Sequence, residues 1–294
     1  MNDFAPIELG DQAIFKRMLS EDPPRISELT FTNLFMWRCR YHPVWRVWGD
    51  CLLIILQPED APPFGLPPVG PGNKSDALAF LCRSLGEVSP EIKLARADSD
   101  FVNTYVDSGD FEIVEDRDNS DYVYRAEDLI NLRGNKYHGK KNHVNRFRKE
   151  NEYEYLTLDA ELAGRFLDLQ EEWCALRECE LNPGLFQEHI AIHEAVMHHE
   201  ELGITGGAIV IEGKVEAFAF GELLNPDTAV IHGEKANPEI PGLYAAINQQ
   251  FCKEAWSHVQ YINREQDLGV DGLRKAKLSY HPDHLVDKFT LIHK

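Results

Sequence analysis

Three short apolar runs follow one another closely in the chain: Ala208-Ile-Val-Ile211, Val215-Glu-Ala-Phe-Ala-Phe-Gly-Glu-Leu223 and Thr228-Ala-Val-Ile-His-Gly-Glu234. Their lengths, and the Glu212-Gly213 turn between the first two, predict an antiparallel meander. An amphipathic helix is expected next over Leu243–Trp256, since its apolar residues recur on one side. The chain then predicts a strand over Val259–Asn263, a helix over Asp271–Leu278 and a last strand over Phe289–Ile292.

Helices are expected before this meander as well, over Lys140–Asn151, Ala160–Arg177 and Gln187–His198. The complete order resembles that of the acyl-CoA N-acyltransferase (GNAT) fold, and the first half of the chain has a less regular version of it. The predicted fold class is therefore α/β (α+β), with two tandem GNAT-like domains whose mixed sheets are flanked by helices. We expect an N-terminal domain over residues 1–128 and a C-terminal domain, carrying the site, over residues 129–294. A single larger α+β domain is the alternative.

The composition favours a cytoplasmic protein. The chain has 294 residues and is 43% hydrophobic, enough for two packed cores. Its longest apolar run, Cys51-Leu-Leu-Ile-Ile-Leu56, is far short of the roughly 18 residues of a transmembrane helix. The beginning of the sequence lacks a signal-peptide pattern. The six cysteines are scattered, which favours reduced, packed thiols over a disulfide framework.

The charge is distributed unevenly. The net charge is −19, yet residues 129–149 contain seven basic residues and no acidic one. Such a segment favours a phosphate-bearing partner, which we expect to contact residues 133–149 through Lys140, Lys141 and Arg146. A solvated helix face is the alternative interpretation.

Several familiar motifs are incomplete. His189 and His193 have the spacing of a metal-binding pair on a helix, but no third ligand is evident, so no metal is expected. A calcium-loop-like stretch over residues 116–127 lacks the required glycine. Neither a Gly-x-Ser-x-Gly elbow nor a Gly-x-Gly-x-x-Gly loop is present. No tightly bound cofactor is therefore expected.

Polar residues gather where the last strands of the second half end. The segment Lys235–Gly242 leads from one strand into a helix, and free N–H groups at such a helix start suit an anion or an oxyanion. An ordinary Pro-Gly helix start is the alternative. The next strand is followed by Asn263-Arg-Glu-Gln-Asp-Leu-Gly-Val-Asp-Gly-Leu-Arg-Lys-Ala-Lys277. Polar clusters at strand ends are typical of α/β sites.

Three segments together resemble one family: Ser27-Glu-Leu-Thr-Phe-Thr-Asn-Leu-Phe-Met-Trp37, Leu132-Arg-Gly-Asn-Lys-Tyr-His-Gly-Lys-Lys-Asn-His-Val-Asn-Arg-Phe147 and the segment 263–277. The chain resembles the phosphatidylglycerol lysyltransferase C-terminal domain family over nearly its whole length. This resemblance implies a tandem GNAT fold related to the Fem peptidyltransferases. It also implies transfer of an aminoacyl group from charged tRNA to a lipid or similar acceptor.

Acyl transfer needs an anchored donor, a base for the attacking amine or hydroxyl, and stabilisation of the oxyanion. Glu234 or Glu265 is expected to be the base or to bind a substrate ammonium, and Arg274 or Lys277 to hold a carboxylate or polarise the carbonyl. Tyr280 is the candidate general acid. The candidate substrate-binding residues are Asn263, Asp267, Gly242, Tyr244, Lys140, Lys141 and Arg146.

The predicted function is therefore aminoacyl-tRNA- or acyl-CoA-dependent transfer to an amine or hydroxyl. The acceptor is an unidentified small molecule, lipid or peptide. Two alternatives remain at this stage: a catalytically inactive binding or regulatory module, and a coenzyme A-dependent small-molecule acetyltransferase.

Overall fold

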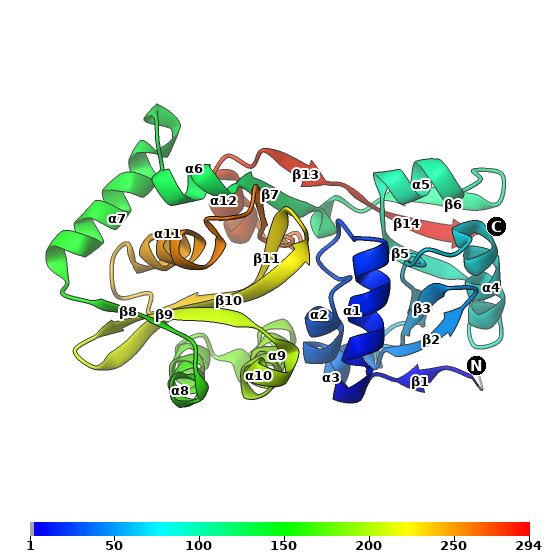
Figure 1. The fold of residues 1–294 in the computed structure, drawn as a ribbon, viewed down its shortest axis with the longest axis horizontal. Helices are drawn as coiled ribbons and strands as arrows, with labels where there is room; N and C mark the ends of the chain where they lie inside the picture. Colours follow the sequence, from blue (N-terminus) through cyan, green and yellow to red (C-terminus); the bar gives the residue numbers. More distant parts are fainter. Residues whose placement is uncertain (1–2) are drawn as a thin grey trace. The chain divides into compact units, whose positions relative to one another are not determined.

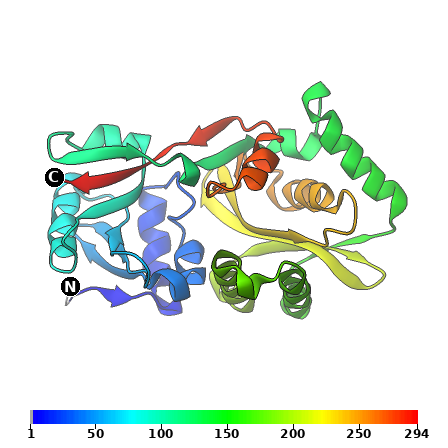
Figure 2. The same cartoon turned by 180° about the vertical axis from the view of Figure 1, so that it is seen from behind.

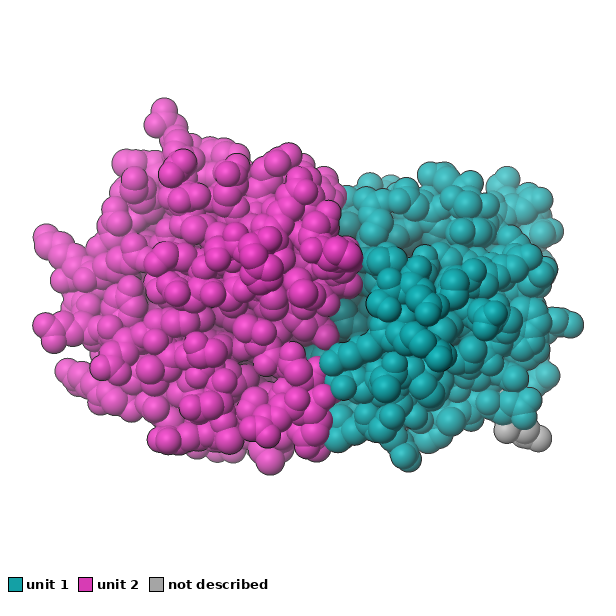
Figure 3. All heavy atoms as spheres, in the orientation of Figure 1, with its two compact units in different colours: residues 1–121, 266–270, 285–294 teal, residues 122–265, 271–284 magenta. Residues whose placement is uncertain are grey.

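The computed structural model describes residues 3–294 and divides the chain into two compact units (Figure 3). The first unit contains residues 1–121, 266–270 and 285–294, and the second contains residues 122–265 and 271–284. Among the described residues, no helix combines the length and the apolar character that a membrane span requires.

The first unit is built on a seven-stranded mixed sheet with the order β1-β2-β3-β4-β5-β14-β6 (Figure 1). Its strands are β1 Ala5–Pro6, β2 Val44–Trp48, β3 Cys51–Leu56, β4 Phe64–Gly65, β5 Lys93–Asp98, β6 Phe111–Glu115 and β14 Lys288–His293. Its helices are α1 Gln12–Glu21, α2 Phe31–Met36, α3 Arg38–Tyr41, α4 Lys74–Gly86 and α5 Ser99–Tyr105. All six residues of β3 are buried, as expected for an apolar strand covered on both faces.

The second unit contains a seven-stranded mixed sheet with the order β13-β7-β12-β11-β10-β9-β8. Its strands are β7 Asp121–Arg125, β8 Glu154–Thr157, β9 Thr205–Ile211, β10 Lys214–Asn225, β11 Thr228–Ala236, β12 Tyr261–Asn263 and β13 His284–Val286. Its helices are α6 Ala126–Asn131, α7 His138–Glu150, α8 Ala160–Leu176, α9 Pro183–Met197, α10 His199–Leu202, α11 Leu243–Trp256 and α12 Asp271–Leu278.

Helices cover both faces of this second sheet. α11 packs on one face, and α8 and α9 lie on the other (Figures 1 and 2). β9, β10 and β11 form the expected antiparallel meander. β11 then pairs in parallel with β12, so the expected neighbourhood of these two strands is confirmed.

The boundaries of the units differ from the expected division at residue 128. β14 pairs with β5 and β6, so the last strand completes the first sheet rather than the second. β6 and β7 follow one another in the chain around a charged turn, yet β6 belongs to the first sheet whereas β7 pairs with β12 in the second. Hydrogen-bond partners distant in sequence decide both assignments.

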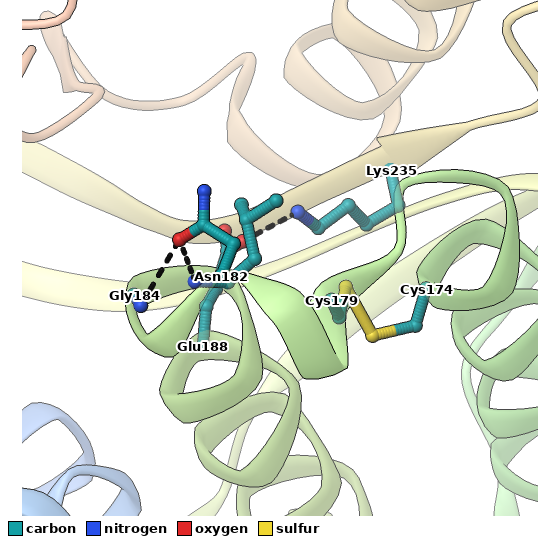
Figure 4. The surroundings of a disulfide bond; sticks show 7 residues. Cys174, Cys179, Asn182, Gly184, Glu188 and Lys235 are labelled. Atoms are coloured by element: carbon teal, nitrogen blue, oxygen red, sulfur yellow. Dashed lines mark hydrogen bonds and ion pairs between the residues drawn. A yellow bond between two sulfur atoms is a disulfide. The ribbon is translucent and has the colours of Figure 1, made fainter.

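The expectation of reduced cysteines is wrong for two of the six. Cys174, near the end of α8, forms a disulfide with Cys179 in a short 3₁₀ helix (Figure 4). The chain turns back between α8 and α9 and brings the two Cα atoms to 5.1 Å, a separation that a disulfide can span. The other four cysteines are free, and Cys39 is exposed.

Candidate functional site

Strands β11 and β12 run side by side only briefly. Thr228–Val230 pair with Tyr261–Asn263, where β12 ends, while β11 continues to Ala236. His232 is an extra residue in this continuation, because Gly233 pairs with Phe220 and Ile231 with Gly221, so a β-bulge interrupts the regular alternation of side chains before Glu234. Gly233 between His232 and Glu234 permits close packing, because a Cβ there would lie 2.2 Å from the Phe220 ring. Two polar side chains thus lie where a neighbouring strand is missing.

His232 is held between two carboxylates. Its ring donates from Nε2 to Glu222 at 3.0 Å and from Nδ1 to Glu265 at 2.9 Å. The His232 side chain is fully buried, whereas the two glutamates are 13% and 20% exposed. Burial alone lowers the pKa of His232, but the two carboxylates outweigh it and raise this pKa to about 9. His232 is therefore an imidazolium at neutral pH.

Glu234 forms a second charged pair beside it. Its Oε1 lies 3.1 Å from Nη2 of Arg264, and its Oε2 accepts from the Asn248 amide at 2.9 Å. Arg264 also lies over the ring of Tyr280, with its Cζ 4.8 Å from the ring centroid. Burial raises the pKa of the Tyr280 hydroxyl, so this group keeps its proton at neutral pH. We call Glu222, His232, Glu234, Asn248, Arg264 and Glu265 the strand-end cluster.

The backbone after β12 is fixed by two of the expected site residues. Asn263 accepts from the Glu265 amide at 2.8 Å, and Glu265 has a left-handed φ of 56°. The buried Lys277 donates to the carbonyl of Arg264 and lies 3.4 Å from that of Glu265. These contacts hold the turn that presents the Arg264 and Glu265 side chains, so Asn263 and Lys277 position the cluster.

Lys140 is the member of the basic segment that reaches this region. Its ammonium lies 4.0 Å from the centroid of the Tyr280 ring, the ring that Arg264 also contacts. Lys141 and Arg146 are exposed on the same helix, and Arg146 pairs with Glu150 at 3.0 Å. The structure therefore separates one inward-facing lysine from an outward-facing basic surface.

The remaining candidate site residues lie outside the strand-end cluster, and most of them stabilise local structure. Gly242 begins α11 with a φ of 84°, and a Cβ there would lie 2.3 Å from the His143 carbonyl oxygen. Tyr244 accepts from the Trp173 indole at 2.9 Å. Asp267 belongs to the first unit, where it is fully buried and accepts from the Gly269 amide. Arg274 is half-buried on α12, and its role stays a prediction.

Sequence inspection did not select Glu222, His232, Asn248 or Arg264. The local sequence contains no signal for His232, because a β-bulge at this residue interrupts the two-residue period of β11. Arg264 stood directly beside the selected Glu265. No comparable signal existed for Asn248, which reaches Glu234 from a helix that packs over the sheet.

Another charged network lies wholly within the first unit. Lys288 and Asp121 are both fully buried and 2.7 Å apart, and Lys288 also lies 2.6 Å from Glu28. Ser27 donates to Asp121 through its backbone and its hydroxyl, and Gln266 donates to both Ser27 and Glu28. Segments 27–37 and 263–277, which carried the resemblance, thus meet here through Gln266. We call these five residues the core network.

The lining of two surface cavities includes no residue of the strand-end cluster or of the core network. One of about 440 Å³ is lined by α8 and the β9–β10 turn, including Arg165 and Lys214. The other, of about 240 Å³, lies in the first unit beside Lys74 and Tyr105. The candidate site is therefore identified from the charged side chains that gather there and not from a cavity.

The sequence matches the family model described as phosphatidylglycerol lysyltransferase, C-terminal, over residues 23–292. A conserved protein of unknown function from Bacteroides thetaiotaomicron is 34% identical, with a TM-score of 0.93 and 99% coverage of each chain. L-PGS from Bacillus licheniformis is 14% identical, with a TM-score of 0.68 and coverage of 97% of this chain and 92% of that chain. FemX is 10% identical, with a TM-score of 0.63 and coverage of 98% and 96%, respectively. No curated protein matches the sequence.

These comparisons confirm the expected fold class, an α/β protein with two mixed, GNAT-like sheets flanked by helices. The fold is acyltransferase-like. Because the family model spans more than nine-tenths of the sequence, the chain belongs to the phosphatidylglycerol lysyltransferase C-terminal family.

Proposed function

We propose that this protein transfers an aminoacyl or acyl group to an amine or hydroxyl acceptor at the strand-end cluster. The observation that carries the proposal is the parting of β11 and β12 after Val230 and Asn263, with five ionisable side chains gathered just beyond it. Active sites of α/β proteins commonly contain charged side chains at the carboxyl ends of strands. Family membership supports the same reaction class.

Glu265 is the best-placed carboxylate for the chemistry. Its side chain is 20% exposed, against 13% for those of Glu222 and Glu234. It also pairs with the charged His232, which Glu222 contacts from the other ring nitrogen. Because His232 donates through both ring nitrogens, it cannot itself accept a proton from the acceptor. In the proposal, Glu265 either deprotonates the attacking group or binds a substrate ammonium. His232, held in turn by Glu222, orients the Glu265 carboxylate.

Arg264 and Tyr280 are placed to act on the donor carbonyl. The Arg264 guanidinium is paired with Glu234 on one side and lies against Tyr280 on the other. A fixed cation and a protonated phenol stabilise the negative charge that develops on the carbonyl oxygen. The sequence assigned this polarising role to Arg274 or Lys277. Since Lys277 is occupied by backbone carbonyls, Arg264 is the better candidate.

The beginning of α11 bears on the choice of donor. The carbonyl of His143, from α7, lies so close to Gly242 that a Cβ could not fit between them. A carbonyl oxygen is an acceptor and repels an anion, so its position at this helix start disfavours a coenzyme A pyrophosphate there. This contact favours aminoacyl-tRNA over acyl-CoA as donor. The acceptor, and the cytoplasmic location, stay predictions.

One observation favours the second candidate, a binding module without catalysis. Each carboxylate of the strand-end cluster already has a partner within the protein, so none of them needs a substrate to balance its charge. A binding module would retain a ligand but release it unchanged.

Donor binding separates these possibilities. Thermal shift with acetyl-CoA, uncharged tRNA and charged tRNA is expected to show stabilisation by charged tRNA above the other two, because a ligand of the folded state raises the apparent melting temperature. Binding is then compared with loss of the aminoacyl group in the presence of hydroxylamine as a small surrogate acceptor. Binding with no enzyme-dependent loss would establish the module instead. Stabilisation by acetyl-CoA alone would show that the donor is an acyl-CoA and not an aminoacyl-tRNA.

A further inference from the structure

We propose that Lys140 and Arg264 form a binding site for a phosphate group, on the ring of Tyr280 and beside Glu234. The identity of the molecule that carries the phosphate rests on the proposed function, whereas the binding site does not. The phosphate belongs to an ester that also has a neighbouring hydroxyl or ammonium group. The site itself is argued from the contacts of these side chains.

Two cations converge on one aromatic ring. The Lys140 ammonium and the Arg264 guanidinium lie 4.0 and 4.8 Å from the centroid of Tyr280. One comes from α7 and the other from the turn after β12, two segments more than a hundred residues apart in the chain. A solvated helix face does not bring a lysine into such a position. Their proximity is unfavourable unless an anion lies near both.

The single nearby carboxylate does not satisfy both cations. Glu234 pairs with Nη2 of Arg264, whereas Nη1 of Arg264 is buried and has no hydrogen-bond partner among residues 3–294. Within the same part of the chain, Lys140 has no carboxylate at ion-pair distance. A buried donor without an acceptor costs about 1–3 kcal/mol, so an arginine nitrogen without a partner and a lysine without a carboxylate, both at the Tyr280 ring, suit an oxyanion.

The pKa of Lys140 agrees with a role in binding an anion. Burial and the neighbouring Arg264 lower the pKa of Lys140 to about 8, and Glu234 opposes this shift only in part. A phosphate at this position would favour the ammonium form and raise the pKa again. The long side chain of a lysine lets its ammonium follow a ligand, and Arg264 offers its Nη1, the nitrogen that does not pair with Glu234.

An acceptor lies beside these donors. Asn248 donates its amide hydrogen to Glu234, while its Oδ1 is buried and unpartnered among the described residues. Glu234 therefore has Asn248 on one oxygen and Arg264 on the other. An oxygen acceptor next to two unsatisfied donors fits a phosphate ester with an adjacent hydroxyl or ammonium group better than it fits a simple dianion.

The test compares two lysines of one helix. Lys140→Met removes the inward-facing charge, and Lys141→Met makes the same change on the exposed neighbour. Binding of inorganic phosphate, glycerophosphoglycerol and 5′-AMP is measured by calorimetry at constant ionic strength, with melting temperatures as a check of folding. We expect Lys140→Met to weaken the preferred phosphate ester roughly tenfold and Lys141→Met less than about twofold, since one charge-assisted contact is lost only in the first. A preference between the last two ligands distinguishes a lipid headgroup from a nucleotide as the source.

A second readout does not depend on the variant folding. Lysines methylated with ¹³C are titrated by NMR in the wild type, where the Lys140 signal should titrate near pH 8 and move to higher pH with phosphate. Equal losses in the two variants, or a Lys140 titration that phosphate leaves unchanged, would overturn the inference. A protein that transfers acyl groups but ignores phosphate contradicts this site alone. One that binds phosphate but transfers nothing contradicts the proposed function alone.

Discussion

The core network of the first unit and the strand-end cluster of the second contain similar residues but differ in how completely they satisfy one another. In the core network, the fully buried Lys288 has two carboxylate partners, and Asp121 accepts from Lys288 and Ser27. In the strand-end cluster, Arg264 and Asn248 each keep a buried polar atom without a protein partner in the described chain. Exposure separates the two networks less: the carboxylates of the strand-end cluster are 13–20% exposed, and in the core network Asp121 is fully buried while Glu28 is 14% exposed.

This difference indicates different roles. A buried ionic network is stable only when every charge is paired, and a saturated network offers nothing to a ligand. Unsatisfied groups in a partly exposed cluster lower stability, and sites commonly keep such groups for their ligands. We therefore infer that the core network specifies structure and that the strand-end cluster binds and reacts.

The largest effect is expected from breaking the core network. Lys288→Met leaves the fully buried Asp121 without its cation, whereas Glu28 keeps Arg96 at 3.1 Å, and loss of one partner of a buried pair costs about 3–5 kcal/mol. Urea denaturation measures this free energy of unfolding. Glu112→Gln, on an exposed position of β6, is the control and should change it by less than about 0.5 kcal/mol. A loss below 1 kcal/mol for Lys288→Met would remove the distinction between the two networks.

A somewhat smaller effect is expected from His232, and it depends on pH. The pKa is raised to about 9 from 6.5, so the stabilisation is complete below pH 6.5 and is lost as the pH rises through 9. A shift of this size corresponds to about 3 kcal/mol. The free energy of unfolding of the wild type should therefore fall between pH 6.5 and 9, whereas that of His232→Gln should fall much less. Parallel pH profiles for the two proteins would show that His232 is not charged in the folded state.

How far the sequence predicted these networks depends on the distance between their members. The apolar runs predicted the meander, α11 and the neighbouring strands β11 and β12, because these follow from local periodicity. Glu234 and Glu265 were selected because they stand at strand ends. Their partners Arg264 and His232 were missed, since ion pairing between strands is not visible in either segment alone. The partnership of β14 with the first sheet was missed for the same reason.

The smallest effect is expected at the outer basic surface. Replacing the outward-facing Lys141 and Arg146 by glutamate should lower affinity for tRNA or heparin and flatten its dependence on salt. The decrease should be modest at physiological salt, because Arg146 already pairs with Glu150. Filter binding over a range of salt concentrations checks this. If the wild type binds neither polyanion at low salt, the basic segment is only a solvated face.

The most direct test of the central claim is enzyme-dependent aminoacyl transfer from charged tRNA to hydroxylamine by the wild type, Glu265→Gln and Glu239→Gln. Glu265 pairs with His232 in the strand-end cluster, whereas Glu239 lies exposed in the loop before α11. We predict at least a hundredfold loss of rate for Glu265→Gln, the usual size of a general-base contribution, measured at a temperature where the melting curve shows this variant to be folded. Glu239→Gln should transfer at the rate of the wild type. Equal rates in all three proteins would contradict the assignment of the strand-end cluster as the site of transfer.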